Sequence, residues 1–241
     1  MQLAPCVEAI DLAIYLQKQK ALVLSALHMG FEESLNVQGI FVPRTHYKDL
    51  VDRLEHVFAV LAKAKKPVKR VVITGDLKHE FGKIARQEWR DVMRMVDYLL
   101  RKCKKLVLIK GNHDVQLGPI ARRQGIELVK DFRADDILII HGDAEPKDMK
   151  GVKAVIMGHE HPAISLRHNR RIEKFKCYIV GTYKRATLIV QPSCNLLTEG
   201  TDVLQGHFLS PLLKGSISRF RAYLIDDQKH EILDFGPLKN L

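Results

Sequence analysis

Short apolar runs, separated by polar turns, recur along the chain. Two of them, 11–16 and 21–28, flank the polar segment 17–20 and predict a β-hairpin. Apolar residues at helical spacing between Thr45 and Pro67 predict an amphipathic helix. Threonine suits the N-cap position, and a proline commonly follows the end of a helix.

The middle of the chain alternates between predicted strands and helices, whereas the end contains predicted strands alone. Helices are expected through residues 89–100 and 119–124. Strands are expected at 70–76 and 126–129, within the strand-and-turn 105–114 and the apolar runs 136–143 and 153–162, and then at 175–180, 186–193, 218–226 and 231–235. This order predicts a layered α/β fold with two sheets, formed as a single domain by residues 1–241.

The composition is that of an ordinary globular protein and indicates no membrane partner. Of the 241 residues 46% are apolar, and no stretch approaches the ~20 consecutive apolar residues of a membrane helix. The first residues include acids and no basic leader, so we expect no signal peptide. The four cysteines form no Cys-x-x-Cys pair, which argues against a zinc ribbon or a disulfide framework and indicates a reducing, cytoplasmic environment.

The net charge of +11 indicates a polyanionic partner. More than half of it lies in residues 165–187, where Glu173 is the only acidic residue. The basic residues of this segment are Arg167, Arg170, Arg171, Lys174, Lys176, Lys184 and Arg185. Two interpretations remain open: a solvated basic loop, or a surface that contacts the phosphate backbone of a nucleic acid. The sequence leaves the oligomeric state open.

Five predicted strands end in side chains suited to metal binding. These side chains are His28, Asp76, the run Asn112, His113 and Asp114, His141, and the pair His159 and His161. Each segment alone has a simpler explanation as a turn or a structural histidine. However, the carboxyl ends of neighbouring strands open onto one crevice, so the five segments can converge on one point.

Imidazole nitrogens and carboxylate oxygens are ligands that suit manganese, iron or zinc. Phosphatases and nucleases hold two such ions about 3.5–4 Å apart. A pair of ions requires a shared carboxylate, and Asp76 is the natural bridge. The pattern therefore predicts a two-metal site.

Four segments resemble the signature blocks of the calcineurin-like metallophosphoesterases, in the expected order, between residues 21 and 161. They are Gly75-Asp76, Gly111-Asn112-His113-Asp114, His141-Gly142 and Gly158-His159-Glu160-His161. The longer strings GDLKHEFG and GHEHP further resemble a group of small prokaryotic, mainly archaeal, phosphoesterases. GDLKH is also similar to a block in double-strand-break-repair nucleases of the superfamily. The resemblance implies a sandwich of two mixed β-sheets flanked by helices.

The resemblance also implies how the two divalent ions are held. Asp76 bridges them, Asn112, His141 and His159 complete one site, and His28 and His161 belong to the other. Manganese is the expected metal, with iron, zinc and nickel as alternatives. The ions activate a water as hydroxide, which attacks phosphorus in line with the leaving group.

Three further residues are expected to act on the substrate or close to it. His113 is expected to stabilise the transition state or protonate the leaving oxygen, and Asp114 to orient the His113 imidazole. His79 is expected to contact the phosphate, with an exposed residue at a helix start as the equal alternative.

One position departs from the family pattern, because the usual Asp-x-His block reads Ala26-Leu27-His28 here. Alanine cannot coordinate a metal, so we expect the site of His28 and His161 to bind its ion weakly and the activity to be impaired. Three explanations stay open: an aspartate replaced deliberately to trap an inactive state, a natural homologue with one firm and one loose metal, or a member that has lost catalysis.

The sequence therefore predicts a metal-dependent hydrolase of phosphate esters, either a phosphodiesterase or a nuclease. A small phosphodiester or a phosphomonoester remains open as substrate, since no recognisable nucleic-acid-binding motif is present. The alternative is a non-catalytic module on the same fold that binds nucleic acid or a partner protein. Retention of His113 and Asp114 argues against it, because holding a metal requires neither.

Overall fold

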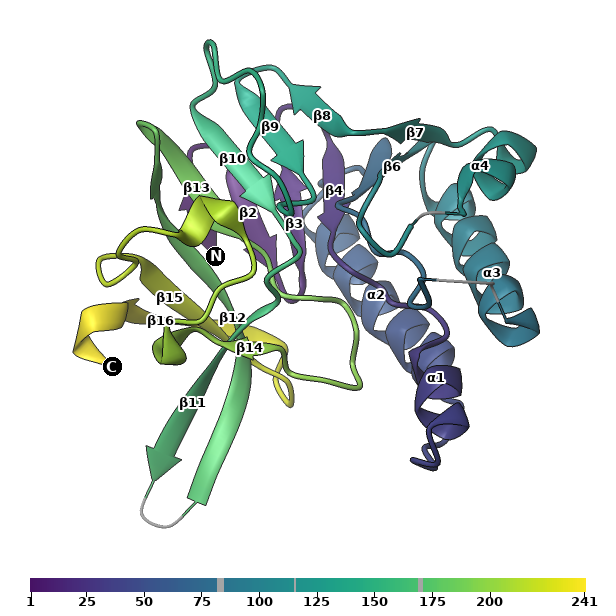
Figure 1. The fold of residues 1–241 in the computed structure, drawn as a ribbon. Coiled ribbons are helices and arrows are strands. Elements are labelled where there is room, and N and C mark those ends of the chain that lie inside the picture. Colours follow the sequence, from purple (N-terminus) through teal and green to yellow (C-terminus); the bar gives the residue numbers. More distant parts are fainter. Residues whose placement is uncertain (82–84, 115, 169–170) are drawn as a thin grey trace.

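The computed structural model describes residues 1–81, 85–114, 116–168 and 171–241, which form two mixed β-sheets packed face to face (Figure 1). The first sheet has seven strands in sequential order. They are β1 (Gln2–Ala4), β2 (Val7–Ile10), β3 (Ala13–Leu16), β4 (Ala21–Leu24), β5 (Arg70–Ile73), β6 (Lys105–Ile109) and β7 (Glu127–Val129). β1 to β4 pair antiparallel, and β4 to β7 pair parallel.

The second sheet has nine strands: seven in the order β14-β11-β12-β13-β10-β9-β8, with β15 paired to β12 and β16 paired to β15. They are β8 (Asp131–Ala134), β9 (Ile137–Ile140), β10 (Ala154–Met157), β11 (Pro162–His168), β12 (Arg171–Tyr183), β13 (Ala186–Val190), β14 (Thr201–Asp202), β15 (Arg221–Asp226) and β16 (Glu231–Pro237). Within it β9, β10 and β13 are parallel neighbours.

Four α-helices lie on the outer side of the first sheet (Figure 1). They are α1 (Phe31–Val37), α2 (His46–Lys63), α3 (Arg86–Lys102) and α4 (Gly118–Gln124), and three 3₁₀ turns occur at Val203–Gln205, Pro211–Leu213 and Leu238–Asn240. α2 buries Leu50, Leu54, Val57 and Leu61, the helical face expected from the sequence. Thr45 stands at its N-cap position, but contrary to expectation its side chain makes no capping hydrogen bond.

Each parallel strand of the second sheet is buried on both faces. On β10, Ala154 and Ile156 join the core between the sheets, whereas Val155 and Met157 pack against C-terminal residues such as Leu212. This explains why β10 reads as a continuous apolar run. None of the helices in the described part of the chain combines the length and apolarity needed to cross a bilayer.

The basic segment 165–187 is not a loop. β11 and β12 pair antiparallel from Ala163↔Lys176 to His168↔Arg171, and this hairpin projects away from the sandwich (Figure 1). β12 then continues as a central strand beside β13. Arg170 of this segment, like Gly82 of the GDLKHEFG string, lies outside the described residues. The sequence-based prediction also missed β1, β2, α1, β8 and β14.

Candidate metal centre

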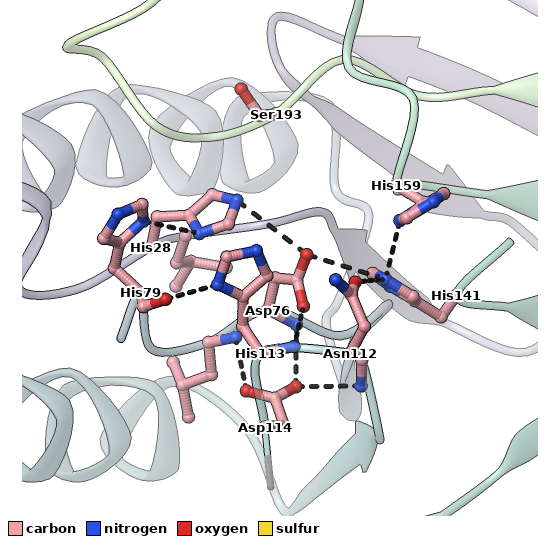
Figure 2. A network of polar contacts seen from close by, with 12 residues as sticks. His28, Asp76, His79, Asn112, His113, Asp114, His141, His159 and Ser193 are labelled. Carbon is pink, nitrogen blue, oxygen red and sulfur yellow. Dashed lines mark hydrogen bonds and ion pairs between the residues drawn. The ribbon is translucent and has the colours of Figure 1, made fainter. Parts of the chain in front are cut away.

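All nine side chains expected at the site lie close together, at one edge of the sandwich (Figure 2). They follow five strands: His28 after β4, Asp76 and His79 after β5, Asn112, His113 and Asp114 after β6, His141 after β9, and His159 and His161 after β10. β4, β5 and β6 run parallel, as do β9 and β10, so each set of strands ends at the same edge.

The backbone turns sharply at these strand ends. Ala26, His28, Asp76, His159 and His161 all have positive φ, between 46° and 61°. Residues with side chains adopt this left-handed conformation rarely, and it persists where the surrounding structure holds it in place. The turns accompany the convergence of the side chains of His28, Asp76, His159 and His161 at the strand ends.

Two glycines allow the loops to approach one another. Gly75 has φ of 96°, and a β-carbon there would lie 2.5 Å from Nδ1 of His141. A β-carbon on Gly111 would collide with the Asp76 carboxylate. The Gly-Asp and Gly-Asn pairs are thus explained by close packing around the site.

The first group of candidate ligands surrounds Nε2 of His141. Nδ1 of His141 donates a hydrogen bond of 2.8 Å to the Thr74 carbonyl, so its Nε2 carries a lone pair. That lone pair faces Asn112 Oδ1 at 2.8 Å, Nδ1 of His159 at 3.1 Å and Asp76 Oδ2 at 3.5 Å. Oxygen and nitrogen donor atoms that converge in this way fit a metal ion.

The second group consists of His28, Asp76 and His161, whose ligand atoms lie within 4.8 Å of one another. His28 Nε2 is 3.9 Å from Asp76 Oδ2. Nε2 of His161 is buried and has no hydrogen-bond partner among the described residues. Burial, reinforced by neighbouring positive charge, holds the pKa of both histidines well below the usual value, so both rings are neutral, as metal ligation requires.

Asp76 therefore belongs to both groups. It is almost fully buried. Burial, followed by the charge of His141, also lowers the pKa of His159. The cluster thus offers neutral imidazoles around one shared acid.

Asp114 does not contact the His113 imidazole, which corrects the expectation from the sequence. Its Oδ2 accepts hydrogen bonds from the backbone N–H of Asp76 (2.7 Å) and Gly111 (3.0 Å), and its Oδ1 accepts from the N–H of Leu77 (3.1 Å) and Lys78 (3.5 Å). Burial and the charge of Asp76 raise the pKa of Asp114 to about 6. Asp114 instead connects the loops that carry Asp76 and His113.

His113 and His79 lie beside the second group. The backbone N–H of His113 donates to Asp76 Oδ1 at 3.1 Å, and its Nδ1 donates to the His79 carbonyl. His79 is half-buried and is not at a helix start, which excludes that alternative; its Nδ1 is 3.4 Å from Nδ1 of His28. Burial, and then the charge of His113, lowers the pKa of His79 to about 4.

A comparison with protein families matches residues 21–149 to the calcineurin-like phosphoesterase model. The chain belongs to this family. The nuclease MPE of Pseudomonas putida is similar in structure, with a TM-score of 0.65, 20% sequence identity, and coverage of 93% of this chain and 92% of that chain. Yfce, a phosphoesterase from E. coli, has 12% identity and a TM-score of 0.40, over 90% of this chain and 98% of that chain. A search of curated protein sequences gave no match.

The calcineurin-like phosphoesterase fold accounts for both sheets and for the position of the site at their common edge. The chain is by family a metal-dependent phosphoesterase, and the groups around Asp76 can hold metal ions. Its departure from the family pattern is buried: Ala26 is 1% exposed, and its N–H donates to the Gly75 carbonyl at 3.2 Å. Ala26 thus stands beside the second group without contributing a ligand.

Two residues that support the site were missed by sequence reasoning. Glu88 on α3 is fully buried, and its Oε1 accepts hydrogen bonds from the backbone N–H of His79 (2.9 Å) and Glu80 (2.8 Å). Phe81 is 57% exposed and its ring centroid lies 3.7 Å from that of His113. Nothing in the sequence indicates this role for Glu88, because a glutamate is ordinary in an amphipathic helix. Phe81 could have been found, because an aromatic residue close to a signature block is a recognisable signal.

Proposed function

We propose that this calcineurin-like phosphoesterase hydrolyses phosphodiesters, as a phosphodiesterase or a nuclease, with two divalent ions. The observation that carries the proposal is the arrangement around Asp76, whose carboxylate belongs to both candidate groups. A two-metal phosphoesterase requires one shared acid of this kind. Manganese is the proposed metal, because carboxylate and amide oxygens join the imidazoles in the first group.

When bound, the two ions supply Lewis-acid activation of a water nucleophile and neutralise charge on the phosphoryl group. Asp76, Asn112, His141 and His159 are the proposed residues of the first site, and Asp76, His28 and His161 those of the second. The tautomer of His113 is fixed by a hydrogen bond. Nδ1 of His113 donates to the His79 carbonyl, so Nε2 is the nitrogen that remains for the substrate. From there His113 can hold a proton for the leaving oxygen.

Asp114 has a positioning role in this proposal rather than a catalytic one. It fixes the backbone of Asp76 and Gly111, and through them the loop that carries His113. His79 likewise acts through its carbonyl, which orients the His113 ring, and its imidazole is available to a phosphate oxygen.

The β11–β12 hairpin supports a nucleic acid as the substrate. Arg167, Arg171 and Lys174 are exposed on it, and the hairpin begins directly after His161. Such charges contact phosphates without reading sequence. We propose a cytoplasmic location, because all four cysteines are free. We also propose that the chain forms one domain, because the main core includes residues of both sheets.

The test is hydrolysis of bis-p-nitrophenyl phosphate, p-nitrophenyl phosphate and single-stranded DNA with Mn²⁺. Because the second group has Asp76 as its one carboxylate, the Ala26→Asp form should be at least tenfold faster than the unchanged chain. His113→Gln in the Ala26→Asp background should lose about 10²–10⁴-fold. Equal rates of the unchanged chain and Ala26→Asp would refute the impairment by Ala26.

Ala26 also favours a second candidate, a non-catalytic module that binds nucleic acid or a partner protein on the same fold. The methyl group of Ala26 replaces the carboxylate that the family pattern has at this position. A binding module does not need that second metal ligand, because it performs no catalysis. Absence of hydrolysis of all three substrates by both forms, together with retained binding of single-stranded DNA, would select this candidate over the enzyme.

A further inference from the structure

His28, His79 and His113 form a further cluster, which shares His28 with the second candidate group but contains two histidines that the proposed two-metal ligand set leaves out. Their ligand atoms all lie within 4.8 Å of one another. The three ring centroids are separated by 5.3, 5.0 and 5.4 Å, so each ring lies beside the other two. This three-histidine cluster contains no carboxylate, unlike the two groups that share Asp76.

Two nitrogens of the cluster are separated by the distance expected between two ligands of a tetrahedral zinc ion. Zinc binds imidazole nitrogen at about 2.0–2.1 Å, which for tetrahedral geometry places two nitrogens about 3.3–3.4 Å apart. Nδ1 of His28 and Nδ1 of His79 are 3.4 Å apart. His113 has its Nδ1 committed to the His79 carbonyl, an orientation that leaves Nε2 for an ion.

From this geometry we propose that His28, His79 and His113 form a third metal site, specific for zinc or a similar imidazole-preferring ion. Three imidazoles and one open position are the ligand set of a tetrahedral zinc with exchangeable water. Manganese prefers carboxylate and carbonyl ligands, so it remains at the groups that contain Asp76.

The zinc site competes with the second group for His28. Nδ1 of His28 faces His79, whereas its Nε2 faces Asp76 Oδ2 at 3.9 Å. A neutral imidazole has one lone pair, so it can bind an ion through one nitrogen while the other carries the proton. With Nδ1 on zinc, the proton resides on Nε2 and points to the Asp76 carboxylate. Ala26 favours this exchange, because it leaves the second group with a single anion.

Zinc at this site also removes His113 from the substrate. Zinc therefore inhibits hydrolysis in the presence of saturating manganese. This consequence rests on the proposed function, whereas the zinc site itself does not.

The test is zinc binding in the presence of saturating Mn²⁺, measured by titration and by X-ray absorption at the zinc edge. The unchanged chain should bind zinc through three imidazoles. His79→Ala should weaken zinc binding at least about tenfold and leave manganese binding unchanged. Asp76→Asn should retain zinc, and His56→Ala, an exposed histidine on α2, should have no effect.

Unchanged zinc affinity in His79→Ala, or loss of zinc in Asp76→Asn, would overturn the proposal. Equal weakening of zinc and manganese in His79→Ala would also overturn it, because His79 would then only orient His28. Thermal unfolding of each variant verifies that it is folded. If no form hydrolyses any phosphodiester, the proposed function fails while the zinc titration still decides the site.

Discussion

At the scale of single residues, the site is defined by which ring nitrogen of each histidine carries the proton. The carbonyls of Thr74 and His79 accept from Nδ1 of His141 and His113 and so fix Nε2 as the free nitrogen. These partners are backbone carbonyls, which every residue has, so they could not be predicted from the sequence. The same holds for Asp114, whose carboxylate accepts hydrogen bonds from backbone N–H groups and not, as expected from the sequence, from the His113 imidazole.

Lys176 is a buried charge close to the second group. Its Nζ donates to Ser193 Oγ (3.0 Å) and the Thr198 carbonyl (2.7 Å), and burial lowers its pKa to about 8. Its charge also contributes to the low pKa of His161, after burial. A fixed ammonium near His161 disfavours a cation there, in the same direction as the effect that we propose for Ala26.

The stability of the chain should depend on pH through Lys176. Its folded pKa lies below the unfolded value of 10.5, so the folded state loses this proton first, between pH 8 and 10.5. The free energy of unfolding contributed by Lys176 therefore rises with pH across that window, by on the order of 3 kcal/mol. Denaturant unfolding of the unchanged chain and of Lys176→Met, from pH 7.5 to 10.5, measures this contribution. If the free energies of unfolding of the two proteins depend on pH in the same way, the effect is excluded.

At the scale of elements, the loops after β5 and β6 are held together by one carboxylate. Asp114 accepts hydrogen bonds from the backbone of both loops, and Glu88 on α3 accepts from the continuation of the first. Helix α3 and the two strand ends thus form one unit beneath Asp76. The sequence predicted each element, but it could not predict these connections, because they join side chains to backbone across long separations.

Replacement of Asp114 should therefore affect stability as well as metal binding. In Asp114→Ala the buried N–H groups of Gly111, Asp76 and Leu77 lose their acceptor, at about 1–3 kcal/mol for each group left unsatisfied. We expect a loss of on the order of 3 kcal/mol or more in the free energy of unfolding. Asp143→Ala, an exposed neighbour of His141, is the control and should change it by at most about 0.5 kcal/mol. Similar unfolding curves for both variants would contradict this role.

The β11–β12 hairpin is the element expected to bind nucleic acid. Arg167→Glu with Arg171→Glu should weaken binding of single-stranded DNA and reduce the slope of log affinity against log salt by about 1.4, since each lost phosphate contact removes about 0.7. Hydrolysis of bis-p-nitrophenyl phosphate should not change. Lys48→Glu with Lys63→Glu on α2 is the charge-matched control. An equal loss of DNA affinity in both double variants would indicate a general charge effect instead of a hairpin surface.

At the scale of the whole molecule, the sequence predicted the two-sheet architecture and the convergence of five strand ends. Both follow from the apolar runs and from the rule that parallel strands end at one edge. The hairpin was missed, because its alternation is obscured by basic residues such as Arg167 and Arg171. The burial of Lys176 was missed for a related reason, since a lysine in a basic run is ordinarily exposed.

The whole account depends on a single acid that two metal sites share. Equilibrium dialysis with Mn²⁺, followed by counting of metal per chain, tests it in the unchanged protein, Asp76→Asn and His159→Ala. We predict one firmly and one weakly bound manganese in the unchanged chain, loss of the firm ion alone in His159→Ala, and loss of both in Asp76→Asn. Manganese binding by Asp76→Asn at the level of the unchanged chain would contradict the account.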